Sequence, residues 1–109
     1  MRLRDMIDAA QAAIRVLGQH TAEELEGTEL LALAVPHAVE PIGEAASHVT
    51  RPFCEVHPEI AWSDVTGMRH RIVHDYYLVD HQRLWDTVHN DPPQLIEQLQ
   101  HILEATGQP

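Results

Sequence analysis

Residues 69–76, with the sequence RHRIVHDY, hold the densest group of chemically active side chains in this 109-residue chain. An arginine stays protonated and offers a planar fork of N–H donors to phosphate oxygens. A histidine gains and loses a proton near neutral pH, because its ordinary pKa is about 6.5. The pair Arg69 and His74 therefore has the groups for chemistry on a phosphodiester, although such a pair on a helix, taken alone, is more often a solvated polar face. Polar support would come from His70, Arg71 and Asp75.

One straight helix cannot bring Arg69 and His74 to the same phosphate. An ideal α-helix leaves these side chains about 140° apart around its axis and about 7.5 Å apart along it. Either the helix distorts before Tyr76, or two copies of it meet across a two-fold axis. The second alternative requires a homodimer.

The predicted reaction is RNA cleavage without a metal ion or any other cofactor. His74 would take the proton from a ribose 2′-hydroxyl, while Arg69 would stabilise the charge that develops on the phosphate. The products would be a 2′,3′-cyclic phosphate and a 5′-hydroxyl, and DNA would stay intact because it lacks the attacking group. His70 and His74 have the i, i+4 spacing of a helical metal site. The chain has no HExxH motif and no cysteine pair, which weighs against zinc.

The motif and its flanks resemble the HepT-like proteins, a branch of the HEPN superfamily. The likeness covers most of the chain and lies in PEIAWSDVTGMR (residues 58–69), LVD (78–80), IGEAA (42–46), Leu84 and Trp85. The resemblance implies a homodimer of all-helical protomers with an Arg-x4-6-His ribonuclease site at the dimer interface. His70 is a departure, since family members commonly have asparagine there.

The resemblance also implies a partner, a minimal nucleotidyltransferase antitoxin that attaches AMP to Tyr76. The chain would then be the toxin of a type II toxin–antitoxin pair. AMP on Tyr76 would occupy the RNA path and cancel local positive charge. The alternative is a non-catalytic helical module that docks a nucleotidyltransferase or a nucleotide. The departure at His70 and the acidic composition favour that alternative.

The charge balance limits how the chain could bind RNA. The net charge is −10, and all seven basic residues are arginines. An acidic chain binds nucleic acid poorly without local cations, so RNA contacts must come from Arg69, Arg71 and Arg83. Arg83 has a second reading, as the partner of Asp80 or Asp86 in an ion pair.

Length and composition favour one cytoplasmic domain. A chain of this size buries only about 65% of its unfolded surface, so self-association is reasonable. The single cysteine, Cys54, excludes an internal disulfide and fits a reducing compartment. No window resembles a membrane span or a signal peptide. We expect one all-α domain over residues 1–109, a small bundle of four to five helices.

The first half of the chain shows helical periodicity and residues that typically begin, end or interrupt helices. A first apolar stripe should end near Gly18; it consists of Leu3, Met6, Ile7, Ala10, Ile14 and Leu17. Thr21 and Glu24 form a capping-box pattern that begins a second segment, interrupted at residues 27–28. The run at residues 30–35 is apolar almost all round and should lie in the core or at a protein contact. Pro36 and Pro41 predict a kink or break between residues 35 and 42.

The second half should contain a connector and three helices. Prolines bound the connector at residues 51–58. Ser63 or Asp64 should cap a helix in which Val65, Met68 and Ile72 share one face. Asp80 should cap the next helix, and the NDPP sequence at residues 90–93 resembles the start of another. Trp62 and Trp85 are interpreted as core anchors rather than platforms for RNA bases.

Overall fold

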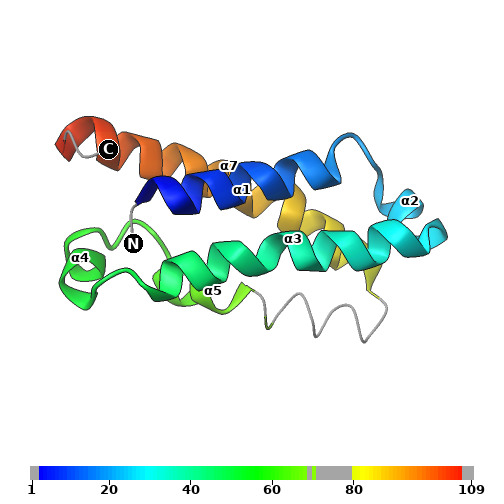
Figure 1. The fold of residues 1–109 in the computed structure, drawn as a ribbon, viewed down its shortest axis with the longest axis horizontal. Coiled ribbons are helices and arrows are strands. Elements are labelled where there is room, and N and C mark those ends of the chain that lie inside the picture. Colours follow the sequence, from blue (N-terminus) through cyan, green and yellow to red (C-terminus); the bar gives the residue numbers. More distant parts are fainter. Residues whose placement is uncertain (1–2, 69, 71–79, 107–109) are drawn as a thin grey trace.

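The computed structural model describes residues 3–68, 70 and 80–106, which form six α-helices and no strand (Figure 1). The helices are α1 (Leu3–Leu17), α2 (Ala22–Gly27), α3 (Glu29–Ser47), α4 (Arg51–Val56), α5 (Trp62–Thr66) and α7 (His81–Thr106). The all-α prediction is confirmed for this part of the chain, which contains six helices where four to five were expected. Within the same ranges, no helix has the length and apolar character needed to cross a membrane.

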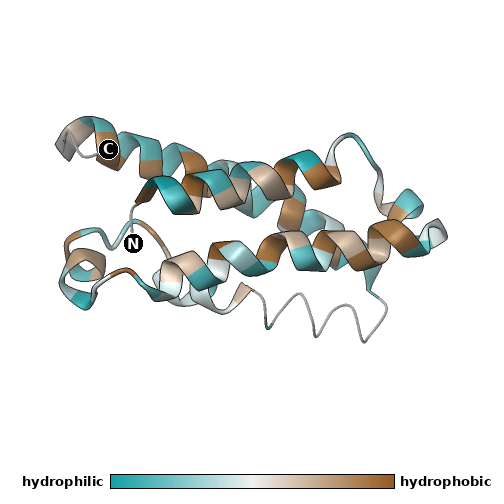
Figure 2. Cartoon of the chain, viewed as in Figure 1, coloured by the Kyte–Doolittle hydropathy of each residue, from teal (hydrophilic) through white to brown (hydrophobic). Residues whose placement is uncertain are grey.

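The three long helices, α1, α3 and α7, build the bundle, and α1 packs against both of the others. Figure 2 shows apolar and polar residues alternating along these helices, as expected when one face of each is buried. The predicted stripe on α1 is confirmed except that Ile14 is only half-buried, whereas Ala13 is buried. The core joins residues of α1 to residues of the other helices, among them Leu25, Val35, Val39, Ile42, Leu84, Val88, Leu95 and Leu99.

The predicted end of the first helix and the predicted start of the second are both confirmed. Gly18 follows α1 with a φ of 54°, the left-handed conformation that glycine adopts without strain. The Thr21 hydroxyl accepts a hydrogen bond from the Glu24 amide at 3.2 Å, and the Glu24 carboxylate accepts one from the Thr21 amide at 3.3 Å. Thr28 then separates α2 from α3 in an extended conformation.

Of the kink or break predicted at Pro36 and Pro41, between residues 35 and 42, the break is wrong, because α3 is one helix from Glu29 to Ser47. Each proline removes one amide donor, but a row of core residues on the same helix remains buried on both sides of them. Val39, which lies between the prolines, is fully buried. Packing of this face therefore outweighs the local preference for a break.

The helix start predicted at residues 90–93 is also wrong, because α7 runs without interruption through Pro92 and Pro93. Its buried residues recur every three or four positions across the prolines, and Pro92 is itself one of them. They are Leu84, Val88, Pro92, Leu95, Leu99, Ile102 and Leu103. Pro92 thus contributes apolar surface to the core in place of the hydrogen bond it cannot make.

Two local predictions in the middle of the chain need correction. The connector at residues 51–58 contains the short helix α4, because Pro52 occupies its first turn, where a missing amide costs nothing. Helix α5 begins after Ala61, so neither Ser63 nor Asp64 caps it. The helix ends at Thr66, and the amide of Gly67 donates to the Ser63 carbonyl at 2.9 Å.

Candidate functional site

Most of the predicted site lies outside the residues that the structure describes. This applies to Arg69, Arg71, His74, Asp75 and Tyr76, while His70 is described as helical and exposed. The structure therefore gives the surroundings of the motif, from Met68 on one side to Asp80 on the other.

The approach to the motif is anchored on α3 through Gly43. A Cβ atom at position 43 would lie 3.3 Å from the Thr66 carbonyl oxygen and 3.4 Å from that of Val65. The backbone of α5 therefore rests directly on α3 at a glycine. Val65 and Met68 are both buried, as predicted, although α5 ends between them; Ile72, the third residue of that predicted face, lies outside the described residues.

The segment after the motif is anchored on α7. The Asp80 carboxylate accepts a hydrogen bond from the Arg83 amide at 3.0 Å, so the predicted cap is confirmed. The Trp85 indole donates to the His20 carbonyl at 2.8 Å and stacks on the His89 ring at 4.2 Å. This side chain joins the start of α7 to the loop between α1 and α2.

The second tryptophan also packs against the core. Trp62 is half-buried, and its indole donates to the His57 carbonyl at 2.9 Å. Its ring meets Phe53 edge to face at 6.1 Å, which joins α5 to α4. Both tryptophans are core anchors, as predicted.

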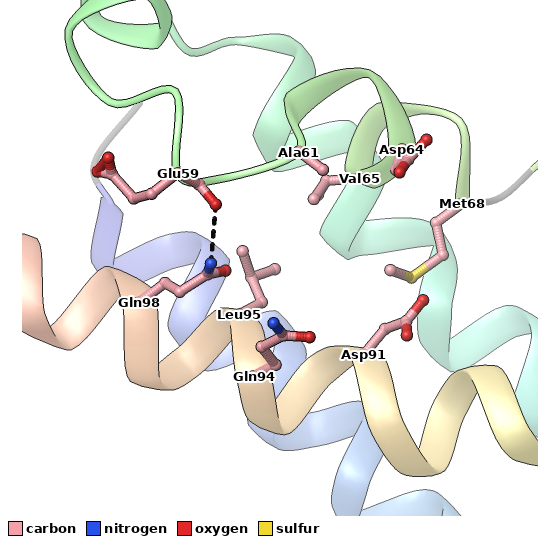
Figure 3. Close-up of a pocket in the computed structure, with 9 residues that line it drawn as sticks. All are labelled: Glu59, Ala61, Asp64, Val65, Met68, Asp91, Gln94, Leu95 and Gln98. Atoms are coloured by element: carbon pink, nitrogen blue, oxygen red, sulfur yellow. Dashed lines mark hydrogen bonds between the residues drawn. The ribbon is translucent and has the colours of Figure 1, made fainter.

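A cavity of about 170 Å³ lies between α5 and α7, directly before the motif (Figure 3). Its apolar wall is made by Val65, Met68 and Leu95, and its polar wall by carboxylates and amides. The Gln98 amide donates to the Glu59 carbonyl at 2.9 Å, which ties the loop before α5 to α7. The described residues that line it are Glu59, Ala61, Asp64, Val65, Met68, Asp91, Gln94, Leu95 and Gln98.

The cavity contains residues that sequence reasoning missed, namely Asp91, Gln94 and Gln98. They recur at helical spacing along one face of α7, beside the buried Leu95. That pattern was present in the sequence, but the break predicted at residues 90–93 separated Asp91 from the other two. If one continuous helix had been predicted over these residues, the pattern would have been visible in the sequence.

Among the described residues, the lining of this cavity includes the carboxylate of Asp91 and the side-chain amides of Gln94 and Gln98, and it includes no arginine or histidine. Throughout residues 3–68, 70 and 80–106, no three His, Cys, Asp or Glu side chains form a group that could hold a metal ion.

A second surface runs along the outer side of α3. The apolar run at residues 30–35 is divided, because Ala32 and Val35 are buried whereas Leu30 and Leu33 are 75% and 43% exposed. The helical spacing continues from these leucines towards α5. We call this row, which consists of Leu30, Leu33, His37, Glu40 and Glu44, the α3 stripe.

The α3 stripe ends at a hollow beside α5. Thr66 contributes to this hollow together with residues of α3 that include His37, Glu40 and Glu44. Thr66 is two residues before Met68, so the stripe connects the exposed leucines to the entrance of the motif.

Comparison with known proteins finds relatives along nearly the whole chain. Residues 6–102 match the family described as Ribonuclease HepT-like. A probable ribonuclease HepT of Thermococcus cleftensis is 33% identical over 96 residues, covering 84% of this chain and 87% of that protein. A putative RNase of Caldanaerobacter subterraneus is 30% identical over 82 residues, with coverage of 75% and 73%. One of Methanocaldococcus jannaschii is 28% identical over 100 residues, with 92% of both chains covered. No solved structure matches the chain.

Proposed function

The chain belongs to the Ribonuclease HepT-like family, within the HEPN superfamily, and on that premise we propose that it is a metal-independent endoribonuclease and the toxin of a type II toxin–antitoxin pair. One observation carries the proposal: the family match spans residues 6–102 and so includes the whole segment 69–76. The relatives named as RNases or as a ribonuclease HepT support the reaction class. Its place of action would be the cytoplasm, which supplies both RNA and nucleotide.

The proposed chemistry uses Arg69 and His74. His74 removes the proton of the ribose 2′-hydroxyl, the 2′-oxygen bonds to phosphorus, and the bond from phosphorus to the 5′-oxygen breaks. Arg69 donates to the phosphate oxygens as charge builds on them. His70, Arg71 and Asp75 support this pair. The products are a 2′,3′-cyclic phosphate and a 5′-hydroxyl.

The proposed enzyme is a homodimer, and the α3 stripe supports this assembly. Exposed leucines rarely cluster on a surface without a partner, and these two continue into the hollow beside α5. The stripe also carries His37 as well as Glu40 and Glu44. Within one chain His37 already lies 3.9 Å from Glu40, and Glu44 lies 3.0 Å from His48. Two stripes that cross in opposite directions would therefore meet mainly through their leucines.

Cleavage of RNA by the purified, unmodified protein tests the activity. Arg69→Ala and His74→Ala should each lower the rate by about 100-fold or more, the usual cost of losing an acid–base or phosphate-binding group. Arg51→Ala and His101→Ala are matched controls, because both side chains are exposed and lie outside the motif and the α3 stripe. Cleavage of DNA at a similar rate, or full activity of His74→Ala, would contradict the assignment.

The mass of the particle in solution tests the dimer. Leu33→Glu should convert the dimer into monomers and abolish cleavage, because it buries a charge at the contact. Val56→Glu is the control, since Val56 on α4 is also exposed, at 71%, but lies outside the α3 stripe. If Leu33→Glu stays dimeric and active, the second copy docks elsewhere.

The proposed partner is a minimal nucleotidyltransferase antitoxin that attaches AMP to Tyr76. The added phosphate would repel RNA and weaken the contribution of the neighbouring arginines. Co-expression with the adjacent nucleotidyltransferase should raise the intact mass by whole AMP units, and Tyr76→Phe should prevent this. Modification that persists in Tyr76→Phe would remove the tyrosine from the proposal.

The second candidate function is a non-catalytic module that docks a nucleotidyltransferase or a nucleotide. Its support is the acidic character of the chain, with a net charge of −10, and of the cavity beside the motif. A stable complex with the nucleotidyltransferase, formed by a dimer that cuts no RNA, would establish this function and exclude the first.

A further inference from the structure

The cavity between α5 and α7 has a lining that suits a nucleobase better than any other part of RNA. Val65, Met68 and Leu95 are buried and provide apolar surface and a polarizable sulfur for the face of a ring. Asp91 and Gln94 provide a hydrogen-bond acceptor and an amide at the edge. A phosphate is disfavoured there by the carboxylate of Asp91, whereas the carboxylate of Glu59 contacts His57 at 3.1 Å and points away from the cavity in Figure 3.

The positions of the polar groups narrow the choice of base. Asp91 and Gln94 are three residues apart on α7, so both project from the same face of the helix. In Figure 3, Asp91 points from α7 towards the side chain of Met68 on the opposite side of the cavity. Asp91 is half-buried whereas Asp64 is exposed, and a carboxylate shielded from water makes the stronger hydrogen bond.

Guanine has the edge that complements this pair. Its Watson–Crick edge carries two adjacent N–H donors, on N1 and N2, and a carbonyl acceptor, O6. A carboxylate accepts two parallel N–H donors, and an amide N–H donates to a carbonyl. Adenine and cytosine each offer an amino group beside an acceptor, and uracil offers a single N–H between two carbonyls. Asp91 also has a contact within the protein, but a carboxylate has about four acceptor positions and so retains capacity for a base.

We propose that this cavity binds the guanine base of an RNA nucleotide beside the cleaved phosphodiester, with Asp91 accepting the N1–H and N2–H donors and Gln94 donating to O6. The inference rests on the proposed ribonuclease function and adds its base specificity. Met68 connects the two, because it lines the cavity and is bonded to Arg69. Phosphate contacts position the RNA, and the cavity would read its sequence.

Short RNAs that differ at one nucleotide test the specificity. The wild-type protein should cleave beside guanosine about tenfold faster or more than beside uridine, the discrimination of one bidentate base contact. Inosine, which lacks the N2 amino group, should fall between them. Asp91→Asn keeps the shape of the side chain but turns one acceptor into a donor, and it should remove this preference. Gln94→Ala should reduce it less.

Glu104→Gln is the matched control, since Glu104 is exposed on the same helix and outside the cavity lining. It makes the same change in charge and should keep the preference for guanosine. Equal cleavage beside all four nucleotides, or equal effects of Asp91→Asn and Glu104→Gln, would overturn the inference while leaving the ribonuclease in place.

A binding measurement separates the two proposals if the protein cuts no RNA. Guanosine should shift the side-chain amide NMR signals of Gln94 and Gln98, and uridine at the same concentration should not. Shifts in a protein without cleavage would retain the base site and reject the ribonuclease. Guanosine that shifts neither amide would reject the base site whatever the activity.

Discussion

Helices α3 and α7 each pass through two prolines without a break, whereas α5, which contains no proline, ends at Thr66 after five residues. The difference follows the amount of buried surface. The proline-containing helices bury apolar residues on both sides of each proline, while α5 buries only Val65. Burial along the length of a helix, more than the residues at one position, decides whether it continues.

The same difference separates the long helices of the bundle from the segment that leads into residues 69–76. The long helices form a core that tolerates unfavourable local sequence. The short α5 and the residues after it lead into the motif, and the cavity opens between this short helix and the rigid α7. Residues on a rigid helix can hold a precise position for a ligand that approaches from the other side. The variants below test how far burial explains the contrast.

The largest effect should come from a core residue beyond the prolines of α7. Leu99 is fully buried, so Leu99→Ala should lower the free energy of unfolding by about 2–5 kcal/mol through lost burial and a new cavity. Urea unfolding measures this. Val56→Ala is the control, because Val56 is mostly exposed and its loss should cost little. Similar costs for the two variants would mean that burial does not hold α7 together.

Adjacent prolines on α7 provide a second test, because Pro92 is fully buried and Pro93 is exposed. Pro93→Ala should stabilise the protein by about 1–3 kcal/mol, since proline inside a helix costs about 3 kcal/mol relative to alanine, and part of that gain is lost through a freer unfolded chain. Pro92→Ala should gain less or even destabilise, because it also removes core surface. Thermal unfolding measures the stability of both variants. Equal changes in stability for Pro92→Ala and Pro93→Ala would contradict the prediction.

The contact between α3 and α5 gives the third test. Gly43→Val should destabilise the protein by about 1–3 kcal/mol, because its side chain would push against the carbonyl groups of Val65 and Thr66. Gly27→Val is the control, since a Cβ at Gly27 would meet nothing within 4 Å. Both variants replace a helical glycine, so the difference between their unfolding free energies isolates the contact. No difference would show that α5 can move away from α3 freely.

The smallest effect should come from the capping box, which depends on neighbours in the sequence rather than on burial. Thr21→Ala should lower the unfolding free energy by about 1 kcal/mol, as the loss of a helix cap usually does. Chemical unfolding at neutral pH measures it. If Thr21→Ala lowered the unfolding free energy as much as Leu99→Ala does, the prediction would be contradicted.

The pH dependence of the capping box has a defined sign. The hydrogen bond from the His20 side chain, followed by that from the Thr21 amide, holds the pKa of Glu24 below its usual value. A depressed pKa means that the folded state favours the carboxylate, so the contribution is present above the usual pKa and is lost as the pH falls through the folded one. The stability difference between the wild type and Glu24→Gln should therefore shrink in acid. Glu23→Gln, at the neighbouring exposed carboxylate, should show no such trend.

Much of the fold was predictable because its signals are local. The capping box at Thr21, the helix end at Gly18 and the cap at Asp80 each depend on groups within a few residues of one another, and all three are confirmed. The motif residues Arg69 and His74 were predicted from their types, their spacing and the family resemblance, and they lie outside the described residues. The cavity was not predicted, because Asp91 was assigned to the start of a new helix.

The sequence alone determined where several helices begin or end and that the described part of the chain is all-α, since capping and apolar periodicity act over one or two helical turns. It also predicted which side chains would carry chemistry. Only the tertiary structure decided that α3 and α7 continue through their prolines, that Leu30 and Leu33 face outward, and that residues of α5 and α7 line one cavity. These outcomes depend on contacts between helices that are distant in the chain. The free energy of that burial is larger than the local preferences from which a sequence is read.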